Sequence, residues 1–62
     1  MITFAYFGKN TDALLIVDDN NKKYSYWTNI KIDENTPVIE MKTENDLCNL
    51  LNALLDCGYT DD

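Results

Sequence analysis

Histidine is absent from this 62-residue chain, and basic residues of any kind are few. Without histidine, no side chain ordinarily exchanges a proton near neutral pH, and Ser25 has no candidate base to activate it. Two cysteines without a histidine do not make up a structural zinc site. A glycine-rich phosphate loop is missing too, since Gly8 and Gly58 are the only glycines. We therefore expect a protein that is not an enzyme and that binds no cofactor or metal.

Disulfides and membrane segments are not expected either. The two cysteines, Cys48 and Cys57, lie on one predicted helix, which separates them by about 13 Å. A disulfide within one chain needs a much shorter separation, so both thiols should be free, as is typical of a reducing cytoplasm. No apolar run approaches the ~20 residues that span a bilayer, and no basic segment of a secretory signal follows Met1. We expect a cytoplasmic protein without membrane contact.

The segment from Thr43 to Gly58 carries the clearest structural signal. Thr43 with Asp46 three residues later resembles a capping box, and Gly58 stands where a left-handed C-terminal cap is expected. The apolar residues between these ends recur at the spacing of one helical face: Leu47, Leu50, Leu51, Leu54 and Leu55. We predict a helix over residues 44–57, with Leu51 at the centre of its apolar stripe. Asparagines on the other face favour helix poorly, so this helix must pack against another element.

The chain before the helix has the composition of strands and turns. Segments 2–7, 13–17 and 23–32 are rich in β-branched, aromatic or aliphatic residues, and a shorter segment, 38–41, follows Pro37. We predict one α+β domain over residues 1–62, in the order β-β-β-β-α. Its four-stranded antiparallel β-sheet would carry the C-terminal amphipathic helix packed on one face.

One helix covers only one face of such a sheet. The first two predicted strands, however, are apolar on both faces, and Trp27 is a large residue on the less apolar side of its strand. For a chain this small, the simplest cover for the second face is a second copy across a two-fold axis. We therefore predict a homodimer. The alternative is a sheet curled tightly enough to cover itself, with Trp27 half exposed.

The net charge of −6 is unevenly distributed along the sequence. Residues 1–32 hold three aspartates against four lysines, a net charge of +1, whereas residues 33–62 hold eight acidic residues against one lysine, a net charge of −7. A charge asymmetry of this size is evidence about partners rather than about fold. The residues that we assign to an acidic partner-binding surface are Asp33, Glu34, Glu40, Glu44, Asp56, Asp61 and Asp62.

These patterns lead to one main functional hypothesis and two alternatives. The main hypothesis is a small acidic inhibitor or regulator of phage or mobile-element type, whose carboxylates mimic nucleic acid and bind a basic surface of a nucleic-acid-handling protein. One alternative is a dimeric single-stranded nucleic-acid-binding protein with an aromatic platform of Tyr24, Tyr26 and Trp27. The element order resembles that of the whirly-type single-strand binders, which work as dimers, but the charge of −6 argues against nucleic acid as a partner. The other alternative is a structural or assembly subunit.

Overall fold

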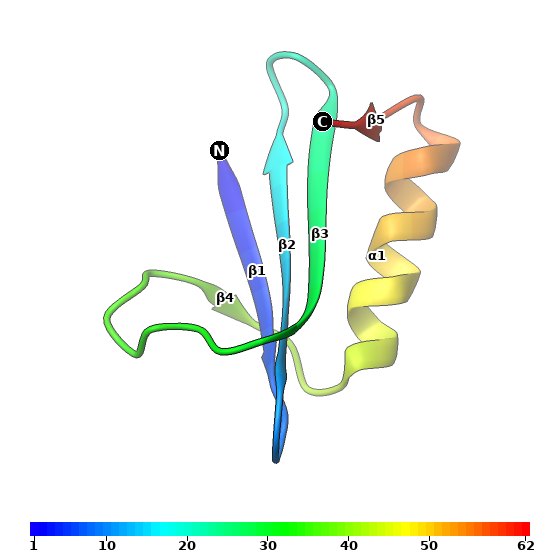
Figure 1. Ribbon diagram of the computed structural model, residues 1–62. Helices are drawn as coiled ribbons and strands as arrows, with labels where there is room; N and C mark the ends of the chain where they lie inside the picture. The colour runs from blue at the N-terminus through cyan, green and yellow to red at the C-terminus, as the bar shows by residue number, and fades with distance from the viewer.

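The computed structural model describes residues 1–62 and contains one five-stranded sheet and one helix (Figure 1). The strands are β1 (Ile2–Phe7), β2 (Asp12–Asp18), β3 (Lys23–Ile30), β4 (Ile39–Glu40) and β5 (Thr60–Asp61), and helix α1 spans Glu44–Asp56. The strand order is β4-β1-β2-β3-β5, and α1 lies on one face of the sheet. The predicted α+β class with a single helix on the sheet is confirmed. α1 is neither long nor apolar enough to cross a lipid bilayer.

Both ends of α1 are fixed by local sequence. The Thr43 side chain accepts a hydrogen bond from the backbone N–H of Asp46 at 3.2 Å, and the Asp46 carboxylate accepts one from the N–H of Thr43 at 3.3 Å. This is the predicted capping box. At the other end Gly58 has a φ of +90°, a conformation that favours glycine, so the chain turns out of the helix there. The helix ends at Asp56, one residue earlier than predicted.

The sheet differs from the predicted four antiparallel strands in two respects. β1, β2 and β3 form an antiparallel meander, but β4 is only two residues long and pairs parallel to β1. The connection between β3 and β4 is long enough to run back across the sheet, so the chain enters β4 in the direction of β1. The second difference is β5, an unpredicted strand that pairs parallel to β3.

The third strand is also shorter than the predicted segment 23–32. Asn29 adopts a left-handed conformation with a φ of +56°, and the register with β2 shifts between Asp12 and Leu14. A bulge of this kind bends a strand and ends its regular pairing. β3 therefore ends at Ile30.

The core lies between α1 and the faces of β1 and β2 that look toward it. Leu15 from β2 and Leu47 from α1 are fully buried, and Ala13 and Val17 complete the buried cluster. Leu51, the predicted centre of the helical stripe, is only partly buried. The partly buried residues packed around this cluster are Phe4, Tyr6, Tyr24, Tyr26, Met41, Leu50, Leu51, Leu54 and Tyr59. The single best-packed point of the helix is thus its first turn rather than its middle.

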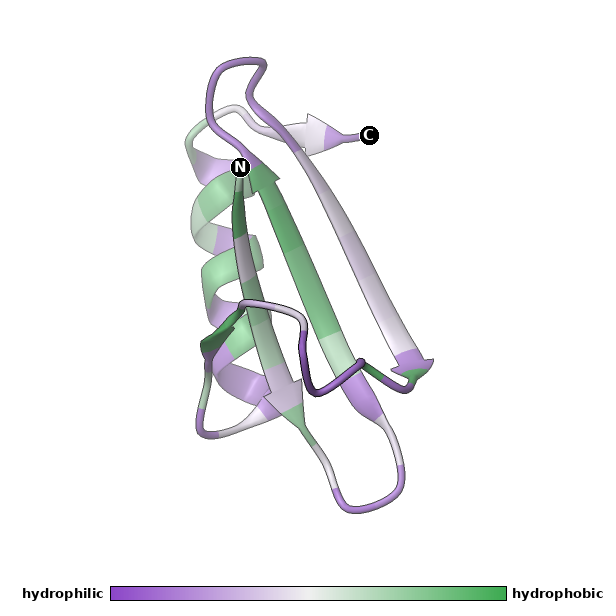
Figure 2. Cartoon of the chain, turned by 90° about the vertical axis from the view of Figure 1, so that its left-hand side faces the viewer, coloured by the Kyte–Doolittle hydropathy of each residue, from purple (hydrophilic) through white to green (hydrophobic).

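The face of the sheet opposite α1 is covered in part by the chain itself. Residues 31–38 cross this face on their way from β3 to β4 (Figure 2). The crossing is anchored by the backbone N–H of Ile32, which donates to the Asp12 carboxylate at 2.9 Å, and Asp12 is 5% exposed. Beyond the crossing segment, Phe7 is 39% exposed and Trp27 is 55% exposed. This face keeps accessible apolar surface, and the homodimer stays a prediction.

One polar contact links the sheet to the helix. The hydroxyl oxygen of Tyr26 lies 3.7 Å from the Sγ atom of Cys48 in α1. Burial and the contact with Cys48 together raise the pKa of Tyr26 to about 12. The protonated phenol is therefore the form that the folded protein favours.

We expect Leu47→Ala to lower the free energy of unfolding by about 2–5 kcal/mol, because it opens a cavity at the best-packed point of the core. Leu51→Ala should cost less, since Leu51 is partly exposed. Urea denaturation of the two variants and of Leu55→Ala, at a residue that is 48% exposed, gives the comparison. An equal or greater loss for Leu51→Ala would show that the centre of the stripe carries the core after all.

The Tyr26 phenol predicts a loss of stability in alkali. Because its folded pKa is raised, its contribution is fully present below the pKa of about 10 of an unfolded tyrosine and is lost as the pH rises toward about 12. Thermal melts across this window should show a steeper fall for the parent than for Tyr26→Phe, which cannot ionise. Parallel curves for the two proteins would contradict the assignment.

Candidate protein-interaction surface

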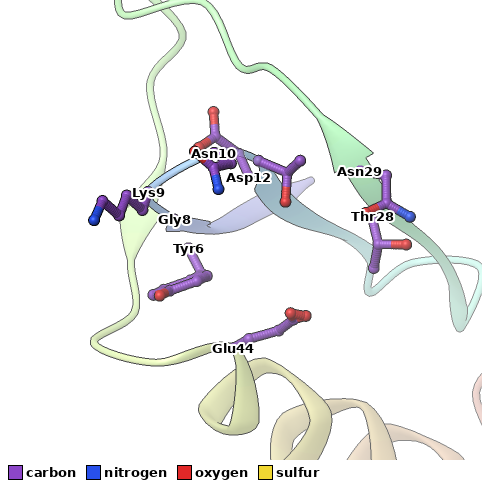
Figure 3. A pocket seen from close by; sticks show the side chains of 9 residues that line it. Tyr6, Gly8, Lys9, Asn10, Asp12, Thr28, Asn29 and Glu44 are labelled. Carbon is purple, nitrogen blue, oxygen red and sulfur yellow. The ribbon is translucent and has the colours of Figure 1, made fainter.

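The only hollow in the surface is small and polar (Figure 3). Its volume is about 260 Å³, and it lies where the β1–β2 turn, the end of β3 and the start of α1 meet. Its lining residues are Tyr6, Gly8, Lys9, Asn10, Thr11, Asp12, Thr28, Asn29 and Glu44. Pockets for small organic ligands are usually larger and lined mainly by apolar side chains. The hollow therefore gives little support to a small-molecule site.

The fold redistributes the charges that the sequence separates. The β2–β3 turn, the end of α1 and β5 lie together at one end of the molecule, at the top of Figure 1. We call this end the acidic tip and define it by Asp18, Asp19, Asp56, Asp61 and Asp62 with Lys22 and Lys23. Five carboxylates against two lysines give the tip a net charge of −3. The rest of the molecule carries six carboxylates and three lysines, also a net charge of −3. The folded protein is therefore not divided into a basic half and an acidic half as its sequence is.

The β2–β3 turn is held by one of these carboxylates. The Asp18 side chain accepts hydrogen bonds from the side-chain amide of Asn21 at 2.9 Å and from its backbone N–H at 3.3 Å. The hydrogen bond from the Asn21 side chain is the main reason that the pKa of Asp18 is lowered. Asp18 is therefore charged and committed to the turn, as is common for aspartate at such a position.

Tyr59 ties the end of the chain to this turn. Its hydroxyl donates to the Asp19 carboxylate at 2.8 Å, a contact that raises the pKa of Tyr59, and the Lys22 ammonium lies 5.4 Å from the centre of its ring. The next residues pair with β3, because the N–H groups of Thr60 and Asp62 donate to the carbonyl oxygens of Lys22 and Tyr24 at 3.1 and 2.8 Å. The tail is therefore an ordered edge strand rather than a frayed end. An aromatic residue directly after Gly58 was the available sequence signal.

The seven acidic residues assigned from the sequence do not form one surface. Asp56 and Asp61, with Asp62 beside them, belong to the acidic tip, whereas Glu40 lies on β4 at the opposite edge of the sheet. Asp33 and Glu34 lie in the segment that crosses the face of the sheet opposite α1, which we call the open face. The structure instead adds Asp18 and Asp19 to the C-terminal group, which the linear charge count had placed in the basic half.

Several of the remaining carboxylates have local structural roles. Asp33 accepts a hydrogen bond from the N–H of Asn35 at 3.0 Å and so forms a turn. Glu44 lies in the first turn of α1, where the helix dipole favours negative charge. Asp56, by contrast, lies at the C-terminal end of α1, where the helix dipole disfavours negative charge, and the last turn contains no basic residue. Within the acidic tip, Asp18 and Asp19 hold the turn and Tyr59, whereas Asp56, Asp61 and Asp62 make no side-chain hydrogen bond within the chain.

The three residues of the proposed aromatic platform lie on two faces of the sheet. Tyr24 and Tyr26 pack against the core beneath α1, while Trp27 alternates to the open face. The structure therefore does not gather Tyr24, Tyr26 and Trp27 into one stacking surface. No group of three metal-ligating side chains converges anywhere in the chain.

Comparison of the chain with protein-family models, with characterised proteins and with solved structures finds no match.

Tyr59→Phe should loosen β5 without unfolding the core. The variant loses the hydrogen bond to Asp19 but keeps the ring beside Lys22, so the backbone amides of Thr60 and Asp62 should exchange with solvent faster while those of β2 are unchanged. Hydrogen exchange followed by NMR measures both. Tyr6→Phe is the control, since the Tyr6 hydroxyl has no hydrogen-bond partner within the chain. Unaltered exchange at β5 would mean that backbone pairing alone holds the tail.

Proposed function

We propose that this protein is a non-enzymatic interaction module, an inhibitor or regulator, that uses the acidic tip to bind a basic surface of a nucleic-acid-handling protein. The observation that supports it most is the placement of Asp56, Asp61 and Asp62. Asp56 is exposed at the end of α1, where the helix dipole already places partial negative charge, and Asp61 and Asp62 are exposed on and beside β5 at the same end of the molecule. Folding gains nothing evident from them there, whereas binding to a basic partner would.

The rigidity of the tip favours this use. Asp61 and Asp62 lie on a backbone that is paired with β3 and anchored by Tyr59, so their carboxylates are presented without first ordering a flexible tail. Binding by a preorganised group avoids the entropic cost of ordering it. Fixed carboxylates on a small domain are also a way to occupy the lysines and arginines that otherwise contact phosphates.

The charge pattern points to a protein partner rather than a nucleic acid. With a net charge of −6, the chain would repel a phosphate backbone, and the split aromatic residues offer no stacking surface to offset this. A basic protein surface would instead attract the tip over a distance of about one Debye length, ~8–10 Å at ordinary salt. The small size and strong acidity are typical of the phage or mobile-element type of inhibitor, and we keep that source as part of the proposal.

The test is the triple variant Asp56→Asn, Asp61→Asn, Asp62→Asn. Its melting temperature should be unchanged or slightly raised, because like charges are removed from one end of the molecule and one of them, Asp56, lies at the helix C-terminus. Its association with the partner, captured from a lysate of the source organism at low salt, should slow by about tenfold and lose most of its salt dependence. Surface plasmon resonance at several salt concentrations measures the rate.

A matched control is Asp33→Asn, Glu34→Gln, Glu40→Gln, which makes the same change in net charge away from the tip. It should leave the association rate close to that of the parent. If the control slows association as much as the tip variant, net charge rather than the tip drives binding. If only the control slows it, the tip assignment is wrong and the open face or the β4 edge binds the partner.

A further inference from the structure

The outer edge of β3 is only partly occupied. Hydrogen bonds from Thr60 and Asp62 reach the carbonyl oxygens of Lys22 and Tyr24, so the even-numbered residues of this strand direct their backbone groups away from β2. By the alternation of an extended strand, the N–H and C=O groups of Tyr26 and Thr28 point outward as well. β5 ends beside Tyr24, and no other strand pairs with this edge. The backbone groups of Tyr26 and Thr28 are thus open to another chain.

The open stretch of this edge, Tyr26 to Thr28, carries neither charge nor proline, and the bulge at Asn29 ends it. Exposed edges are commonly protected by lysine, by proline or by inward-pointing charge. Residues 24–30 contain no charged residue and no proline. The opposite edge is covered at Phe4 and Ala5 by β4, which ends on Glu40. In a chain of net charge −6, the β3 edge therefore lets a second chain pair without meeting a carboxylate on the pairing strand itself.

Trp27 lies between the two open backbone positions. It is 55% exposed on the open face, directly opposite Leu14 of β2. An indole this exposed next to an unpaired edge gives a partner strand both hydrogen bonds and apolar contact.

We infer that the β3 edge binds the β3 edge of a second copy of this chain, antiparallel, with a two-fold axis at Trp27. In this register Tyr26 of each copy exchanges two backbone hydrogen bonds with Thr28 of the other. The outward N–H and C=O groups of all four residues are then paired. The two Trp27 side chains then face each other as a closely spaced, non-hydrogen-bonded pair on the open face. The proposal is independent of the acidic tip, which binds a different partner.

Neighbouring registers are blocked by the fold. Moving the axis to Tyr26 would require the outward groups of Tyr24, which β5 already uses. Moving it to Thr28 would require Ile30, which follows the left-handed Asn29 and the bulge. The bulge also turns the strand away where it would meet β5 of the other copy. The self-complementary register about Trp27 is the one that remains.

Electrostatics are compatible with a second copy in this arrangement. Antiparallel strands place the acidic tips at opposite ends of the dimer, because each tip adjoins the start of β3. The contact is small, below the ~1,200 Å² of a standard interface, so the association should be weak and dependent on concentration.

The test follows the parent chain by sedimentation from about 10 μM to about 1 mM, the range in which small interfaces associate. The mass should rise from 7.2 kDa toward twice that value. Trp27 is the only tryptophan, so its fluorescence should shift to shorter wavelength over the same range. Hydrogen exchange at high concentration should protect the amides of Tyr26 and Thr28.

Trp27→Lys places two ammonium groups at the axis and should keep the chain monomeric throughout. The matched control is Ile39→Lys on the opposite edge, at a residue that is 52% exposed, and it should dimerise like the parent. Circular dichroism checks that both variants fold, and the exchange measurement on the parent does not depend on either. A parent that stays monomeric at about 1 mM, a dimer whose Tyr26 and Thr28 amides exchange freely, or an Ile39→Lys chain that fails to dimerise would each overturn the proposal.

Discussion

The contact on which this small structure depends is the packing of Leu47 against Ala13, Leu15 and Val17 of β2. A 13-residue helix with asparagines on its outer face is marginal in isolation, and the apolar residues of β2 need an element that covers them. Burying Leu47 in the first turn joins the two and fixes the direction in which α1 leaves the sheet. Because α1 is then held beside β1 and β2, its far end returns the chain to the β2–β3 turn, and the position of the C-terminal residues follows from that one contact.

The return of the chain has an electrostatic consequence. Tyr59 binds Asp19 and lies beside Lys22, and β5 adds its backbone to the start of β3, so the C-terminal carboxylates become a fixed part of the same end as the β2–β3 turn. The fold accepts like charges near the helix C-terminus because they remain exposed, where water and salt reduce the repulsion. The local concentration of negative charge is thus set by the geometry of the tip as well as by its composition.

Features set by neighbouring residues could be predicted, and features set by distant ones could not. Thr43, Asp46 and Gly58 act within one helical turn of their own position, so both ends of α1 were predictable to within a residue. The parallel pairing of β4 and β5 depends on where the connecting segments cross, and a two-residue strand has no periodicity to detect. The importance of Leu47 over Leu51 depends on the point at which α1 crosses β2. For the same reason the charge count along the chain did not group Asp18 and Asp19 with the C-terminal acidic residues, because these residues are close only in space.

β5 connects the two proposed surfaces and also separates them. Its two residues carry or adjoin the carboxylates of the tip, and its pairing beside Tyr24 blocks the upper part of the β3 edge, which confines an incoming strand to Tyr26 and Thr28. An edge left fully open would allow several registers and a risk of uncontrolled strand pairing. An edge closed along its whole length would leave Trp27 exposed without a partner. With β5 as short as it is, one register remains, and a dimer in that register directs its two acidic tips away from each other. Each dimer would then present two separated tips to a basic surface, and a partner with two such surfaces at the matching distance would bind both more tightly than either alone.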